Sequence, residues 1–183
     1  MGVPAQTPLD NTREQRGWYM YDWANSAYSS TVLTLFLGPY LTAMAKAAAG
    51  ADGFVYPLGV KVDPRSFWGY MVSLSVLAQV FVLPLAGSIA DYGRRKRELL
   101  GALAFTGAIA TTCFFFVANG AYLFGGALFF VANLAFGSSM AVYNSFLPEI
   151  ARPEERDAVS SNGWGIGYAG GGLLLALNLV FLS

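Results

Sequence analysis

A short charged segment between two long uncharged ones limits what this chain can fold into. Four consecutive cations, 94–97, follow Asp91 closely, and no charged residue occurs in 66–90 or in 99–148. A bilayer core about 30 Å thick is crossed by about 20 apolar helical residues. Lys and Arg gather in the short cytoplasmic loops between such helices. The pattern therefore predicts a cytoplasmic loop that joins two membrane-spanning helices.

Composition agrees with a membrane protein and excludes several other classes. Of the 183 residues, 55% are hydrophobic and 12% are charged, whereas soluble domains carry about 25% charged residues. The formal net charge is zero, so nucleic acid is not an expected partner. The chain has no histidine and one cysteine, Cys113. These counts exclude an intrachain disulfide, a Cys/His zinc site and imidazole acid–base catalysis.

Charge-free windows predict an all-α integral membrane protein. Four windows are long enough to cross a bilayer, and the third, 99–148, is long enough for two spans. Asn119-Gly120 lies near the place where a turn between those two spans is needed. We predict a cytoplasmic segment over 1–19 and a bundle of five transmembrane helices over 20–183. The helices are expected at 20–45, 67–90, 98–118, 121–147 and 161–183. The last span has no polar flank, so we expect a truncated part of a longer protein.

The placement of Lys and Arg predicts the orientation. If the N-terminus is cytoplasmic, eight of these residues lie in inner segments and three in outer segments. Positive residues favour the cytoplasmic side of short loops. The chain is therefore expected to have its N-terminus inside.

A glycine-rich stretch predicts close helix packing. Residues 165–170 match the dinucleotide pattern G-x-G-x-x-G, but that pattern needs a preceding strand and a following acidic residue. This stretch instead lies in an apolar span. Gly163, Gly167 and Gly171 are four residues apart, which is the spacing that lets membrane helices approach closely.

Polar residues within the first span are candidates for function. Asp22, Asn25 and Ser26 lie at i, i+3 and i+4, on one face of a helix. A carboxylate at this depth normally faces protein or a water-filled cavity. Both gating and simple helix-to-helix bonding explain these residues.

Three polar residues fall near the middle of spans: Thr34, Gln79 and Asn133. Burying such groups costs free energy unless they are hydrogen-bonded. For any one of them, an interhelical hydrogen bond is the more frequent role.

Charged residues of both signs also belong to the predicted inner loops. Asp91 and the basic run lie in one loop, and Glu149 and Arg156 flank the other. Together they predict a cytoplasmic cluster that locks one arrangement of the helices and releases in another, an electrostatic gate.

Several segments resemble known transporters. Gly87 to Lys96 resembles the loop between the second and third helices of major facilitator superfamily transporters, although Tyr92 replaces a basic residue and the loop is one residue short. The segments 21–27, 143–151 and 163–168 are similar to the autophagy-related vacuole effluxer branch of that superfamily and its bacterial relatives.

This resemblance implies a secondary active transporter of small polar solutes that works by alternating access. Amino acid efflux is the activity of the fungal members. The family has twelve helices in two halves, so the chain would supply five helices of the N-terminal six-helix half. Its partners would be the lipid bilayer, a small polar solute, and the C-terminal half of a longer transporter or a partner chain. A bacterial cytoplasmic membrane is the expected location, with no cofactor or metal.

The resemblance also implies roles for individual residues. The expected substrate-facing residues are Asp22, Asn25, Tyr28, Thr34 and Asn133. The expected cytoplasmic gate consists of Gly87, Asp91, Arg94, Arg95, Glu149 and Arg156.

Two other functions stay open at this point. The first is a non-transporting membrane assembly or regulatory module that binds a partner through its glycine-rich fifth helix. The second is a membrane enzyme, which is disfavoured because the sequence shows no nucleophile–base pair or metal set.

Overall fold

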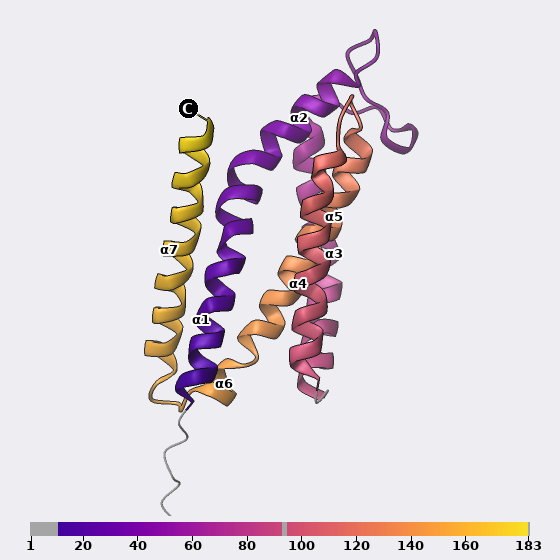
Figure 1. Ribbon diagram of the computed structural model, residues 1–183. Helices are drawn as coiled ribbons and strands as arrows, with labels where there is room; N and C mark the ends of the chain where they lie inside the picture. Colours follow the sequence, from indigo (N-terminus) through magenta and orange to yellow (C-terminus); the bar gives the residue numbers. More distant parts are fainter. Residues whose placement is uncertain (1–10, 93–94, 183) are drawn as a thin grey trace, which may run out of the picture. The chain divides into compact units, whose positions relative to one another are not determined.

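The computed structural model describes residues 11–92 and 95–182, and these residues are almost entirely helical. Apart from one isolated bridge, Val55 with Val62, the described residues contain no β-structure. The elements are α1 (Thr12–Ala27), the π-helix η1 (Tyr28–Phe36), α2 (Leu37–Ala47), the 3₁₀ helix η2 (Pro57–Gly59), α3 (Pro64–Tyr92), α4 (Lys96–Thr112), the 3₁₀ helix η3 (Cys113–Phe116), α5 (Tyr122–Asn144), α6 (Leu147–Ile150) and α7 (Arg156–Leu182) (Figure 1).

The predicted all-α membrane architecture is confirmed. Among the described residues, four helical segments are long and apolar enough to cross a membrane: Pro64–Tyr92, Lys96–Phe116, Tyr122–Ile150 and Arg156–Phe181. The first predicted span, 20–45, is not among these four; it is helical throughout but is divided among α1, η1 and α2. Large apolar side chains point outward, and Phe105 and Phe115 are 72% and 85% exposed. Apolar surface on this scale is expected where lipid covers the helices.

The helix bounds differ from the predicted bounds mainly at polar ends. The first helix begins at Thr12, inside the segment expected to be a cytoplasmic tail, and α7 begins at Arg156 rather than at 161. The sequence criterion marks only the apolar part of a span, whereas a helix continues into its polar flank. The turn expected at Asn119-Gly120 is present, and both residues have positive φ, 52° and 78°. Glycine and asparagine tolerate that backbone region best.

The described residues form two compact units. The first contains the residues up to Val32 together with those from Phe146 onward, and the second is Leu33–Ser145. The chain leaves the first unit within η1 and returns to it just after α5.

In the first unit, α1 and α7 run side by side and parallel (Figure 1). Trp18 lies against Gly163, Asp22 against Gly167 and Trp23 against Gly170, so residue numbers increase together along both helices. Near the start of α1, the Gln15 side-chain amide donates a hydrogen bond of 2.9 Å to the backbone oxygen of Ile150 in α6.

The face of α7 that contacts α1 is made of glycines. A Cβ at Gly163 would lie 2.4 Å from an atom of the Trp18 ring, and a Cβ at Gly170 would lie 2.6 Å from the backbone oxygen of Trp23. The two helices are therefore closer than any side chain on that face would permit, as the spacing of the glycines predicted. Gly165 and Gly172 lie elsewhere on α7, where a Cβ would meet open space.

In the second unit, α5 is the central helix. It contacts α2, α3 and α4, and its Phe129 is fully buried, with its ring 4.6 Å from the ring of Trp68 in α3. Small residues let the other helices approach it. A Cβ at Gly125 would lie 2.5 Å from Leu41 of α2.

The connection from α2 to α3 is folded onto the end of this unit. Val55 and Val62 exchange two backbone hydrogen bonds of 3.0 and 2.9 Å. Their side chains pack with Ala45 of α2 and Phe67 of α3. Asp63 then begins α3, because its carboxylate accepts a 2.8 Å hydrogen bond from the backbone N–H of Arg65, a standard helix N-cap.

Asp52 organises the exposed part of this connection. Its carboxylate accepts a hydrogen bond from the Tyr56 hydroxyl and lies 3.8 Å from the Lys61 ammonium. The hydrogen bond from Tyr56, helped by the backbone N–H of Phe54 and the charge of Lys61, holds the pKa of Asp52 below its usual value.

Replacing Gly170 by alanine should lower the free energy of unfolding by about 1–3 kcal/mol, as overpacking does. The new Cβ would stand 2.6 Å from the Trp23 backbone oxygen, and backbone cannot rotate away as a side chain can. Gly172→Ala is the matched control, because it faces open space and gains about 1 kcal/mol of helix propensity. Unfolding of the purified protein in mixed micelles measures both, and equal losses at the two positions would contradict the glycine contact.

Candidate functional site

Polar side chains connect α3 and α5 inside the second unit. Asn133 is 7% exposed, and its amide nitrogen donates a 2.9 Å hydrogen bond to the Ser75 hydroxyl oxygen. The Ser75 hydroxyl donates in turn to the backbone oxygen of Val72, at 2.8 Å. The Gln79 amide nitrogen donates a 3.1 Å hydrogen bond to the backbone oxygen of Asn133. We call Ser75, Gln79 and Asn133 the α3–α5 polar contact.

This contact gives Asn133 a structural role that the sequence left open. Its amide bonds across the helix interface, which satisfies a polar group that would otherwise be costly in an apolar interior. Sequence reasoning noticed Gln79 and Asn133 but not Ser75, because a serine in an apolar helix usually bonds to its own backbone. Only the packing of α3 on α5 shows that Ser75 also accepts a hydrogen bond from Asn133.

Two further serines of α5 are buried. Ser138 and Ser139 are each 1% exposed. The Ser139 hydroxyl donates to the backbone oxygen of Phe136 at 2.8 Å. Within residues 11–92 and 95–182, the Ser138 hydroxyl has no hydrogen-bond partner. The second unit therefore holds polar groups at its centre, as well as at its ends.

In the first unit, the predicted polar face of α1 is directed at α7. Asp22 is 8% exposed, and both its carboxylate and the Ser26 hydroxyl lie beside Gly167. Asn25 and Tyr28 are half-buried. Tyr28 is the first residue of the π-helix η1, in which Thr31 is 3% exposed. π-helical turns are rare and are frequent at functional sites.

The expected substrate-facing residues are thus divided between the two units. Asp22, Asn25 and Tyr28 belong to the first unit, and Thr34 and Asn133 belong to the second. Within its unit Thr34 is exposed, while Asn133 is buried in the α3–α5 polar contact. The substrate-facing role of all five residues stays a prediction.

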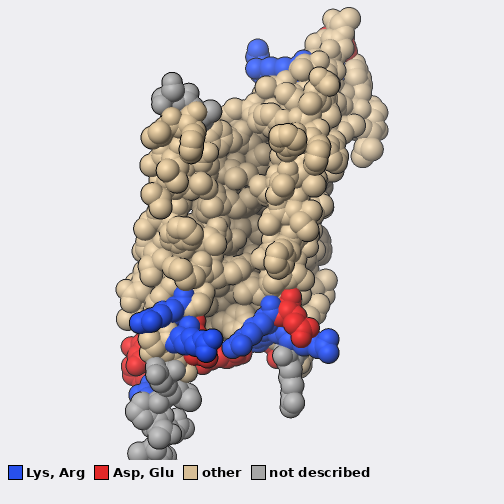
Figure 2. Space-filling model, viewed as in Figure 1, with Lys and Arg blue, Asp and Glu red and all other residues tan. Residues whose placement is uncertain are grey.

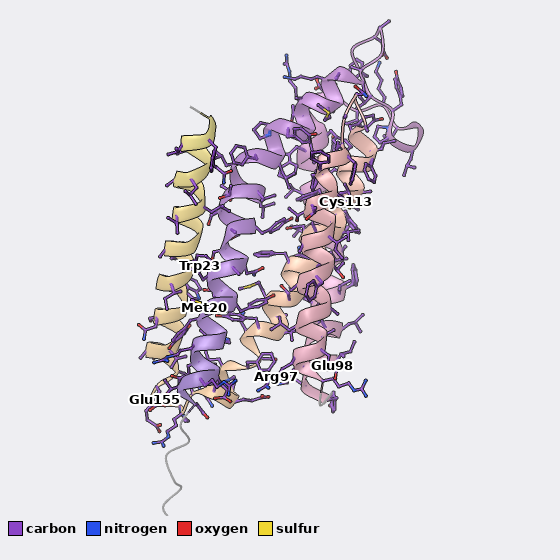
Figure 3. All side chains as sticks on the ribbon, viewed as in Figure 1. Met20, Trp23, Arg97, Glu98, Cys113 and Glu155 are labelled. Atoms are coloured by element: carbon purple, nitrogen blue, oxygen red, sulfur yellow. The ribbon has the colours of Figure 1, made fainter. Side chains whose placement is uncertain are left out.

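Charged side chains gather near helix ends, and the surface along the helices is formed by other residues (Figure 2). Arg97 and Glu98 lie at the start of α4, and Glu155 lies just before α7 (Figure 3). In each unit this leaves an uncharged length of helix, which is the arrangement that a bilayer requires.

Lys96 is the residue that connects the charged ends of the second unit. Its ammonium lies 3.9 Å from the Asp91 carboxylate at the end of α3 and donates a 3.3 Å hydrogen bond to the backbone oxygen of Ser145 just after α5. The Lys96 side chain is only 16% exposed. A cation at the C-terminal end of a helix is also favoured by the helix dipole.

Arg95, one of the expected gate residues, forms an ion pair with Glu98. Its guanidinium lies 3.6 Å from the Glu98 carboxylate, one turn further along the chain. Both side chains are largely exposed, and exposed ion pairs contribute little to stability. Lys96, rather than Arg95, holds Asp91, because Arg95 immediately precedes α4 and reaches into its first turn.

The other expected gate residues are divided between the two units. Gly87 is in α3, and a Cβ there would meet open space, so no helix of its unit packs tightly against it. Glu149 and Arg156 belong to the first unit, where the Arg156 guanidinium donates a 3.4 Å hydrogen bond to the backbone oxygen of Ala151. Arg94 lies outside the described residues. The gate itself stays a prediction.

Comparison with known proteins gives the family. The chain matches the family described as "Vacuole effluxer Atg22 like" over residues 10–183. It is 31% identical to Autophagy-related protein 22-1 of Penicillium rubens over 80% of its length, and 31% identical to Autophagy-related protein 22 of Neurospora crassa over 91%. It is 28% identical to the uncharacterized MFS-type transporter YxiO of Bacillus subtilis over 87%. No solved structure matches the chain significantly.

The apolar helices define an integral membrane protein, and the proteins to which the chain is similar are a vacuole effluxer family and an MFS-type transporter. The chain belongs to the vacuole effluxer Atg22-like family, and the resemblance seen in the sequence is confirmed. It spans 31%, 26% and 35% of the lengths of the three relatives named above.

The hydrogen bond between Asn133 and Ser75 should contribute about 0.6–2 kcal/mol to stability, the range for interhelical bonds in membranes. A double-mutant cycle with Asn133→Ala and Ser75→Ala should measure this coupling from the unfolding of the purified protein. Asn178→Ala is the control, because the Asn178 amide bonds to Leu174 within its own helix. A coupling of zero would show that the two helices do not depend on this bond.

Proposed function

We propose that the chain is part of a secondary active transporter that moves small polar solutes by alternating access, with amino acids as the first solutes to test. The family match over residues 10–183 carries this proposal. The name of the Bacillus relative, an MFS-type transporter, supports it. The structure adds the physical requirement, uncharged membrane-spanning helices with polar side chains buried among them.

Five residues are proposed to face the solute: Asp22, Asn25, Tyr28, Thr34 and Asn133. Polar and ionisable groups within membrane helices are costly and usually serve a pathway. For Asn133, the bond to Ser75 means that solute recognition would use its remaining hydrogen-bonding capacity.

We propose that the gate contains charged residues of both units, and that their ion pairs form and break during the transport cycle. One unit contains Gly87, Asp91, Arg94, Arg95 and also Lys96, the residue that sequence reasoning did not select. The other unit contains Glu149 and Arg156. Rocking of helices during alternating access is the motion that such charges would control.

The rest of a transporter would come from outside this chain. Because the chain spans about a third of the relatives that it matches, we propose that it functions together with the C-terminal part of a longer product or with a partner chain. The placement of Lys and Arg supports a cytoplasmic N-terminus. We propose a bacterial cytoplasmic membrane as the location.

One observation disfavours the alternative of a non-transporting module that binds a partner through its glycine-rich helix. The buried glycines of α7, at 163, 167, 170 and 171, are already in contact with α1 of the same chain. The exposed Gly165 and Gly172 do not form a continuous small-residue face of that kind.

Transport by the full-length gene product in proteoliposomes tests the proposed function. Liposomes preloaded with unlabelled amino acids should accumulate the matching labelled amino acid by counterflow, because an alternating-access carrier exchanges solute across the bilayer. Empty liposomes are the control. A protein that is correctly inserted but gives no counterflow with any member of a panel of amino acids, small peptides and sugars would contradict the proposal.

Asp91→Asn should slow transport several-fold while membrane insertion is retained, because it removes the carboxylate partner of Lys96. The exchanged pair Asp91→Lys with Lys96→Asp should recover part of the rate by restoring opposite charges. Glu98→Gln is the control, because Glu98 is exposed and pairs with Arg95 instead. Counterflow rates measure all three, and a wild-type rate for Asp91→Asn would remove Asp91 from the gate.

A further inference from the structure

The carboxylate of Asp22 lies directly against the backbone of α7. Its Oδ2 atom is 2.5 Å from the position that a Cβ of Gly167 would occupy, and the Ser26 Oγ atom is 2.9 Å from the same position. Asp22 is 8% exposed and Gly167 is buried. Two oxygen-bearing side chains of α1 therefore converge on one glycine of α7.

This buried carboxylate has no partner in the part of the chain that the structure describes. It makes no hydrogen bond and no ion pair with residues 11–92 or 95–182. Glycines form the face of α7 that contacts α1, and a glycine has no charge and no side chain that could form a hydrogen bond. The neighbouring Ser26 has only a neutral hydroxyl to offer.

The other titratable groups of this unit do not supply the missing charge. Arg156 and Asp157, the charged residues of α7, begin that helix at least ten positions before Gly167, which is about 15 Å along a helix. The remaining titratable groups on α1, α6, α7 and the α6–α7 connection also form no ion pair or hydrogen bond with Asp22. They are Arg13, Glu14, Arg16, Tyr19, Tyr21, Tyr28, Glu149, Arg152, Glu154, Glu155 and Tyr168.

An ionised carboxylate in such a place costs several kcal/mol unless its charge is neutralised. In the absence of solute, a proton or a metal cation can neutralise this charge. A desolvated metal cation takes several oxygen ligands, but α1 is regular helix around Asp22 and its carbonyl oxygens are engaged in the helix. A proton needs one carboxylate oxygen, and we expect the resulting O–H to donate to the Ser26 hydroxyl oxygen, which converges on the same glycine.

We propose that Asp22 is a proton-binding site, occupied while α1 and α7 are packed together and emptied when they separate. Binding converts the carboxylate to the neutral acid with a proton from solvent. Loss of the proton leaves a charge against the α7 backbone, which favours separation of the two helices. Resting on the proposed function, this inference makes the proton the coupling ion of transport.

Infrared spectroscopy of the full-length gene product in lipid nanodiscs tests the site without any transport. The wild type should show the C=O band of a protonated carboxylic acid at neutral pH, and Asp22→Asn should lose that band. Asp157→Asn is the matched control, an exposed aspartate on α7, and should keep it. A wild type without the band, or a band that survives in Asp22→Asn, would overturn the proposal.

Two further measurements keep the test decisive. Ser26→Ala should shift the band toward that of a free acid, because the acid loses its hydrogen-bond acceptor, and this reading stands even if Asp22→Asn fails to fold. An unshifted band would overturn the pairing with Ser26. Loss of the band when Na⁺ replaces K⁺ at constant pH would assign the site to a metal cation instead. The infrared band is measured without solute, so it is independent of transport. If counterflow is present but the band is absent, only the proton site is overturned. If the band is present but counterflow is absent, only the proposed function is overturned.

Discussion

The requirement that every polar group find its partner inside the protein governs this structure. Lipid offers no hydrogen bonds, so a spanning segment must satisfy its backbone within the helix. Side chains follow the same rule. The hydroxyls of Thr106, Thr111 and Thr112 in α4 each donate to the carbonyl oxygen four residues earlier, at 2.8 Å. A polar side chain that departs from this local solution therefore marks a helix contact or a site.

Two departures stand out, one in each unit. In the second unit, Asn133 and Ser75 satisfy each other across the α3–α5 interface, and this contact holds the central helix to its neighbour. In the first unit, Asp22 stands against the glycine face of α7 with no partner in the described part of the chain. The first arrangement costs little because it is paired, whereas the second requires a ligand or a change of state. The hydrogen bond therefore gives Asn133 a structural role, whereas a functional role for Asp22 is a proposal.

Glycines allow contact between helix faces, and charged residues connect helix ends. The buried glycines of α7 let α1 approach along its length, which brings together residues about 145 positions apart in sequence, such as Trp18 and Gly163. At the helix ends, Lys96 connects α3, α4 and the end of α5 through one carboxylate and one carbonyl oxygen. Contacts made of glycine and backbone are insensitive to ions, while those at the ends depend on charge. A transporter needs both kinds, because its helices must pack in lipid and still exchange partners.

The sequence by itself determined the features that depend on near neighbours. Long charge-free windows gave the spans, and the Asn119-Gly120 pair gave the turn between two of them. Four-residue glycine spacing indicated a close packing face. Each of these three signals depends on residues that are near one another in the sequence. The same local evidence placed Asp22 and Ser26 on one face of α1, and motif similarity indicated the family.

Only the tertiary structure decided which residues are partners. Asp91 pairs with Lys96 rather than Arg95, because the start of α4 directs these two neighbouring side chains differently. Asn133 bonds to Ser75, and Asp22 faces Gly167, because packing joins segments that no sequence pattern relates. Helix formation in a membrane is a local property of composition and period. Partnership between side chains is a property of distance in space, which the order of residues does not contain.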